Sequence, residues 1–218
     1  MRRTKDEAEA TRTAIIKAGL KIFAAIGPES ANLQSVAEAA GVTRGAIYWH
    51  FRNKWDLLDA IMEHFTTPVN TFGLDSPEAP QPDPLGDIAQ MIDRLLTHVA
   101  RDEVYRNVFR LQAHLSSVRN QTRSHGQSRH RRFEQMMALK HRYRCIALEN
   151  AKRCGQLPDD LDVQAGACYI SAMIEGLVTN YLAMPELYDL ESRAGQFTEV
   201  IMIGLKQGLK GLGPAPAP

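Results

Sequence analysis

The sequence offers little that would support a disulfide framework, a zinc site or a membrane anchor. Its three cysteines are odd in number and show no CxxC spacing, which excludes a disulfide scaffold and indicates no zinc site. There is no signal peptide and no run of about 18 apolar residues, so we expect a cytoplasmic protein with no membrane partner. The formal net charge of only +1 excludes general coating of polyanions.

The patterns that would indicate catalysis or a β-sheet are also absent. No nucleophile stands beside a base, and no set of metal ligands or phosphate-cradling loop is present. His125 and His130 are five residues apart, so they do not share a helix face. No alternating strand pattern competes with the helical periodicity. We therefore expect an all-α chain that is not an enzyme and needs no cofactor or metal.

What the sequence does contain is a pair of short helices joined by a tight turn, at about residues 33 to 51. Gly41 can take the left-handed conformation that ends the first helix, and Thr43 is a suitable N-cap for the second. A small residue at Ala37 lets the two helices approach, and Ile47 supplies the apolar contact between them. This spacing is typical of a helix-turn-helix unit.

The second helix has an outer face that is unusual for a surface exposed only to water. Tyr48 and Trp49 stand beside Arg44, which can donate to guanine O6 and N7 in a major groove. The aromatic residues can reach phosphates or a thymine methyl. Each residue also has an alternative without DNA. Arg44 could be a solvated surface residue, and Tyr48 and Trp49 could pack on a neighbouring helix. His50 could be a histidine that only packs beside the core. The candidate DNA-binding residues are Asn32, Thr43, Arg44, Gly45, Tyr48, Trp49, His50 and Lys54.

The N-terminal quarter resembles the DNA-binding domain of the tetracycline-repressor (TetR) family, through Ile15 to Gly27, Val36 to Phe51 and Lys54 to Leu57. The variant Thr43 to Phe51 is most similar to the branch that represses multidrug efflux pumps. That branch usually has a hydroxyl residue where this chain has Asn32, which can still cap the helix. The resemblance implies a three-helix DNA-binding domain, then a larger helical domain that binds inducer and dimerises, with about nine helices in all.

The chain divides on this basis into a DNA-binding domain (1–53), a ligand-binding and dimerisation domain (54–212) and a disordered tail (213–218). A helix from Lys54 to about Thr66 would connect the two domains. Five prolines between residues 68 and 84 should end that helix, and Asp83 with Pro84 should begin the next. Further helices are expected from 102 through 112, from 127 to 153, from 162 to 184 and from 189 to about 212.

The last two helices carry the apolar stripes of a predicted dimer interface. Glycine at three and four residue spacings would allow close helix approach. The stripes could equally be the core of one chain. The resemblance implies a four-helix bundle between two chains, and a two-fold axis predicts a palindromic operator. The candidate interface residues are Ile170, Tyr181, Phe197, Ile201, Gly204, Leu205 and Gly208.

Methionines on several helices of the larger domain suggest a ligand cavity. Methionine re-packs around irregular shapes and suits promiscuous recognition, although it also fills gaps in ordinary cores. The candidate ligand-binding residues are Met62, Phe65, Thr66, Met91, Leu95, Gln112, Met137, Met173, Leu177 and Asn180. We therefore expect a homodimeric repressor, released from double-stranded operator DNA by a hydrophobic or aromatic small-molecule inducer.

The largest charge anomaly lies at residues 119 to 144, where eight Lys or Arg accompany a single acidic residue. Such a run is usually a solvated face, but it could also attract an anionic or phenolic ligand or add phosphate contacts. Two other kinds of regulator stay open at this stage. One is a redox switch acting through Cys145 or Cys154, and the other is a DNA-binding regulator with no effector.

Overall fold

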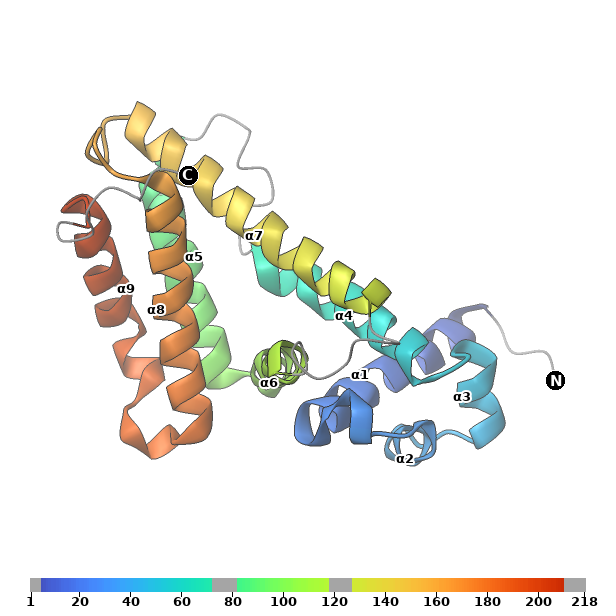
Figure 1. The fold of residues 1–218 in the computed structure, drawn as a ribbon. Coiled ribbons are helices and arrows are strands. Elements are labelled where there is room, and N and C mark those ends of the chain that lie inside the picture. Colours follow the sequence, from blue (N-terminus) through green and yellow to red (C-terminus); the bar gives the residue numbers. More distant parts are fainter. Residues whose placement is uncertain (1–4, 72–81, 118–126, 210–218) are drawn as a thin grey trace. The chain divides into compact units, whose positions relative to one another are not determined.

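The computed structural model describes residues 5–71, 82–117 and 127–209 (Figure 1). These residues are helical, with no strand among them, which confirms the expected all-α class. No helix in the described ranges is both long and apolar enough to span a bilayer. The helices are α1 (Lys5–Ser30), α2 (Leu33–Ala39), α3 (Arg44–His50), α4 (Lys54–Thr71), α5 (Pro84–Arg101), α6 (Glu103–Ser117), α7 (Gln127–Arg153), α8 (Val163–Ala183), the 3-10 turn η2 (Pro185–Leu187) and α9 (Leu190–Lys206).

The chain forms two compact units that are discontinuous in sequence. The first comprises Met1–Asn70 with Glu103–Phe133, and the second comprises Thr71–Asp102 with Glu134–Pro218. α6 therefore belongs to the same unit as the helix-turn-helix, because it packs against α1. The functional division at residue 53 stays a prediction.

A kink in α1 marks where α6 docks in the first unit. Gly27 has a positive φ of 76°, and Pro28 follows it inside the helix. Since proline has no N–H, the carbonyl of Ala24 cannot receive its usual helical hydrogen bond. His114 Nε2 of α6 lies 3.1 Å from that carbonyl oxygen and donates to it. A neighbouring helix thus supplies the missing donor.

The predicted end of α4 near Thr66 is wrong, because the helix continues through Pro68 to Thr71. One proline removes a single helical hydrogen bond and can be accommodated by a kink. The predicted proline-rich break then falls mainly on residues 72–81, outside the described residues. The predicted tail, 213–218, also lies outside them.

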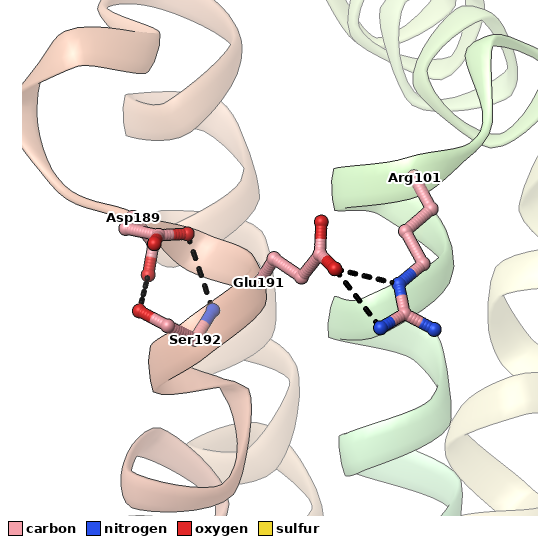
Figure 2. A network of polar contacts seen from close by, with 4 residues as sticks. All are labelled: Arg101, Asp189, Glu191 and Ser192. Atoms are coloured by element: carbon pink, nitrogen blue, oxygen red, sulfur yellow. Dashed lines mark hydrogen bonds and ion pairs between the residues drawn. The ribbon is translucent and has the colours of Figure 1, made fainter.

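In the second unit α5, α8 and α9 lie side by side (Figure 1). α5 begins as predicted, with the Asp83 carboxylate accepting from the Gly86 N–H at 2.9 Å. α9 begins in the same way, with Asp189 accepting from the Ser192 N–H at 3.1 Å. The Arg101 guanidinium donates to Glu191 at 2.9 Å, so it ties the end of α5 to the start of α9 (Figure 2).

α9 is shorter than expected. It ends at Lys206 rather than near Leu212, because Gly208 takes a positive φ of 67° and Leu209 one of 51°. Left-handed residues at these positions close the helix. The Leu209 N–H returns to the Gly204 carbonyl at 3.1 Å, which completes the C-terminal cap.

Candidate DNA-binding surface and ligand-binding residues

The turn between α2 and α3 has the predicted geometry. Gly41 has a φ of 66°, and the Val42 N–H donates to the Ala37 carbonyl at 2.9 Å. This is the left-handed closure that glycine permits at a helix end. Before α2, the Asn32 side chain accepts from the Ser35 N–H at 2.9 Å. Asn32 therefore caps α2, as predicted.

Two buried side chains, one in α3 and one at its C-terminal cap, hold α3 against the core. Ile47 and Phe51 are 0% and 2% exposed, and Thr43 caps the helix by accepting from the Ala46 N–H at 3.2 Å. The short helix is thus held by one polar cap and two apolar contacts. Its orientation is set by core packing, which leaves its other face available.

The outward face of α3 is the most exposed aromatic surface among the described residues. Trp49 is 73% exposed and Tyr48 is 48% exposed, beside exposed Arg44 and Gly45. These values rule out the alternative in which Trp49 packs on a neighbouring helix. The Arg44 guanidinium lies 5.8 Å from the Tyr48 ring centroid, a cation–π contact that positions the arginine.

His50 occupies an intermediate place on α3. Its ring is partly buried and makes an edge-on contact with Trp49 at 4.5 Å, and a tilted contact with Phe51 at 6.2 Å. It therefore supports the exposed tryptophan from the side. Its predicted phosphate contact remains a prediction.

Lys54 has a structural role that the sequence did not reveal. Its ammonium donates to the carbonyl oxygens of Glu29 and Ala31, the second at 3.1 Å, at the end of α1. Carbonyls at a helix C-terminus lack helical partners, and a cation there is favourable. A sequence signal for this role was available. The last turn of α1 contains no basic residue of its own, so its carbonyls needed a cation from elsewhere in the chain. The phosphate contact of Lys54 remains a prediction.

The predicted ligand-binding residues are divided between the two units. In the first unit, Phe65 is 9% exposed, Met62 is partly buried, and the Thr66 side chain lies outside the described part. Gln112 is partly buried, and its buried amide nitrogen has no hydrogen-bond partner in the described ranges. Such a group is costly unless something accepts from it.

The second unit holds the remaining candidates. Met91 and Leu95 of α5 face the interior and are 4% and 5% exposed. Met137, Met173 and Leu177 are partly buried, whereas Asn180 is exposed. Asn180 therefore lies on the outer face of α8, and its side chain does not point into the core of one chain.

The predicted dimer interface needs correction. Ile170, Ile201 and Leu205 are 0% exposed within a single chain, so they have no surface left to bury against a second. Gly204 does permit a close approach, but its neighbour is Tyr169 of the same chain: a Cβ on Gly204 would lie 2.5 Å from the Tyr169 hydroxyl. Gly208 lies beyond the end of α9. These five residues serve the monomer core and a helix cap.

Tyr181 and Phe197 belong to an aromatic cluster of one chain. Tyr188 lies 6.3 Å from the Tyr181 ring and 5.5 Å from the Phe197 ring, between centroids. Its hydroxyl donates to the Leu177 carbonyl. The cluster closes the corner between α8 and α9, so these two residues are only partly available to a partner.

The apolar surface that remains exposed on α9 was missed in the sequence. Val200 and Ile203 are 55% and 45% exposed. They are three residues apart on the face opposite Ile201 and Leu205, and that second apolar stripe was the available signal. The exposed residues of α8 include the small Cys168, Ala172 and Gly176 at four-residue spacing.

Two family models match the chain, and together they cover most of it. Residues 15–61 match the family described as bacterial regulatory proteins, tetR family. Residues 83–206, more than half of the chain, match the C-terminal region of the MAATS-type transcriptional repressors. The chain belongs to the TetR family. The resemblance inferred from the helix-turn-helix residues is thus confirmed, and it extends through α5 to α9.

TetR-family relatives align over nearly the whole chain. The probable HTH-type transcriptional regulator ArpR of Pseudomonas putida is 34% identical over 87% of this chain and 89% of its own length. A solved SmeT–triclosan complex has a TM-score of 0.71 and 27% identity, and covers 96% of this chain and 98% of its own. Another structure is of SmeT described as the repressor of the Stenotrophomonas maltophilia multidrug efflux pump SmeDEF. It has a TM-score of 0.67 and 25% identity, and covers 97% of this chain and 98% of its own. This TetR-family chain is therefore a transcriptional regulator.

Proposed function

We propose that this regulator binds a palindromic operator as a homodimer, through the outward face of α3, and represses a multidrug efflux operon until a hydrophobic or aromatic inducer releases it. The observation that carries the DNA-binding part is the exposure of Arg44, Tyr48 and Trp49 on a helix whose other side is fixed in the core. A rigid helix with exposed base-reading groups fits a major groove.

Each exposed group on α3 has a chemical role in this proposal. Arg44 forks onto guanine, Gly45 allows close approach of the backbone, and the aromatic residues contact phosphate or a thymine methyl. The modest positive excess of the first 55 residues, nine Lys or Arg against five Asp or Glu, suits a few phosphate contacts. Affinity should therefore fall steeply with salt.

The dimer in this proposal forms through the outer faces of α8 and α9. Exposed Val200 and Ile203 supply apolar surface, and the small residues Ala172 and Gly176 let a partner helix approach closely. Apolar surface of this kind is typical of subunit interfaces. The family-based expectation of a helical dimer interface is kept, but its residues are different from those predicted.

The efflux and inducer parts of the proposal derive from the relatives. SmeT, the repressor of the multidrug efflux pump SmeDEF, also forms a complex with triclosan. Triclosan is an aromatic phenol, which agrees with the inducer class expected from the sequence. By contrast, a redox switch through Cys145 loses support, because burial raises the pKa of that thiol, which disfavours the reactive thiolate.

Footprinting and fluorescence anisotropy on the DNA upstream of the chain's own gene and of neighbouring pump genes would test this proposal. We expect a protected palindrome, and release on adding triclosan. An absence of any protected site would refute the DNA-binding part. A protected site that no aromatic compound releases would refute the inducer part. A palindrome far from any pump gene would refute the efflux part.

A further inference from the structure

The inward face of α7 carries two positive charges where apolar residues are expected. Ala147, Leu148 and Ala151 are 0% exposed and form the buried stripe of this helix. One and two turns earlier on the same stripe are Arg144 and Lys140, both partly buried. An amphipathic helix normally fills such positions with apolar side chains.

The contacts of α7 show that this stripe faces α8. A Cβ on Gly166 of α8 would lie 3.0 Å from Leu148 Cδ1. About two turns before Leu148, His141 Nε2 donates to Gln164 of α8 at 2.7 Å. Lys140 and Arg144 therefore project from the side of α7 that packs in the second unit.

Neither cation has an ion-pair or hydrogen-bond partner within the described part of the chain. The carboxylate that acts on both of them is Glu175 of α8, which is exposed and not within salt-bridge distance. Burial, and after it repulsion from Arg144, lowers the pKa of Lys140 to about 7. Burial also lowers the pKa of Arg144. Two neighbouring cations without a counter-ion are unfavourable in the free protein.

A bound carboxylate would remove this penalty. The Arg144 guanidinium can donate two parallel hydrogen bonds to its oxygens, and the Lys140 ammonium one turn away can donate a third. Met137 shares the stripe one turn before Lys140, and Met173 lies on α8 two residues from Glu175; both are partly buried. An apolar side chain on the same stripe as two cations, as Met137 is on α7, suits an amphipathic acid.

We propose that Lys140 and Arg144 form an anion-binding subsite in the second unit, which holds the carboxylate of an amphipathic inducer while the neighbouring Met137 contacts its apolar part. This inference rests on the proposed ligand-responsive function and specifies its ligand. It also assigns a role to part of the basic run at residues 119 to 144.

Two matched pairs of probes test the charge of the ligand directly. We would measure the Kd of 2-naphthoate against the neutral 2-naphthalenemethanol, and of decanoate against decanol, at pH 6.5. The wild type should bind at least one acid more tightly than its alcohol. Lys140→Met and Arg144→Met should each weaken that acid by about 10- to 100-fold and leave the alcohol unchanged. Arg142→Met, which removes an exposed charge from the same helix, is the control and should change neither.

A pH series separates a direct contact from a merely structural role. Because the free Lys140 is charged only below about pH 7, the affinity of the wild type for the acid should weaken as the pH rises from 6.5 to 9. The charged groups that act on Lys140 are Arg144 on α7 and Glu175 on α8. The weakening should disappear in Lys140→Met, whose fold is checked by thermal unfolding without ligand.

The outcomes separate this inference from the function on which it rests. No preference of the wild type for either acid over its alcohol, including no binding at all, would overturn the anion subsite. Equal affinities of the acid for the wild type and both methionine variants would also overturn it. Operator binding by the wild type, measured on the same preparation, tests the regulator proposal separately and is unaffected by either result.

Discussion

At the scale of single residues, Arg44 is the side chain that we propose reads the DNA sequence. It is exposed and held over the Tyr48 ring at 5.8 Å. Arg44→Ala should weaken operator binding by about 1 to 3 kcal/mol and relax the preference at one base pair. Fluorescence anisotropy with a set of singly substituted operators measures both effects. The control is Lys17→Ala, which removes an exposed charge from α1. A uniform loss over all operators would show that Arg44 contacts phosphate instead.

Lys54 combines a structural contact with a predicted DNA contact, and one substitution separates them. Lys54→Ala leaves the carbonyls of Glu29 and Ala31 without their charged donor, so the free energy of unfolding should fall by about 1 to 3 kcal/mol. If Lys54 also contacts phosphate, the salt dependence of operator binding should become shallower by about one unit of slope. Urea denaturation measures the first effect and a salt titration the second. An unchanged salt slope would leave Lys54 as a structural residue only.

Lys140 gives a stability effect with a definite sign. Its pKa is about 7 in the folded chain, against an ordinary value of 10.5 that the unfolded chain keeps. Between about pH 7 and pH 10.5 the unfolded state binds more protons at Lys140 than the folded state does. The contribution of Lys140 to the free energy of unfolding therefore rises with pH. Urea denaturation from pH 6.5 to 9.5 should therefore show a steeper rise in the wild type than in Lys140→Met. The raised pKa values of Cys145 and Tyr188 oppose this trend in both proteins and cancel in the difference. Parallel curves would contradict the burial of Lys140.

At the scale of elements, the contact between α1 and α6 includes one side-chain hydrogen bond with a specific role. His114 donates to the Ala24 carbonyl that Pro28 cannot serve. His114→Ala should lower the free energy of unfolding by about 1 to 3 kcal/mol, because a buried acceptor loses its partner. His114→Gln keeps a donor and should recover part of this loss. Equal destabilisation by both variants would mean that ring packing, not the hydrogen bond, secures α6.

The elements also show which local signals determine helix boundaries. Asp83, Asp162 and Asp189 all cap helices through side-chain acceptors, and the sequence predicted Asp83 as the start of its helix. α4 passing through Pro68 was not readable, because a single proline weakens a helix without requiring it to end. The early end of α9 depends on the left-handed conformation of Gly208, whereas the sequence alone also permitted a helical glycine.

At the scale of the whole molecule, the proposed dimer surface makes a direct prediction. Val200→Glu combined with Ile203→Glu places two charges on the exposed apolar face of α9. Burying unpaired charges in a subunit interface is costly, so the variant should sediment as a monomer and lose high-affinity binding to a full palindrome. Ile26→Glu, at an isoleucine of α1 that is 51% exposed, is the control and should remain dimeric. A dimeric double variant would place the interface elsewhere.

The sequence by itself determined the class of the protein and the exposed helix face that is proposed to meet DNA. Gly41, Thr43, Ala37 and Ile47 specify the helix-turn-helix through local rules of capping and close contact, which need no knowledge of distant residues. The neighbouring exposed aromatics on α3 followed from helical periodicity alone, and the resemblance to the TetR family rested on these same positions.

Only the tertiary structure decided which apolar stripe is core and which is surface. Ile201 and Val200 are adjacent and both aliphatic, but one is fully buried and the other is 55% exposed. Periodicity finds both stripes of α9, and the position of α5 and α8 determines which of them is covered. The same holds for Lys54 and Lys140. A lysine reads as a surface charge in the sequence, and only the groups packed around it turn it into a helix cap or a partly buried cation.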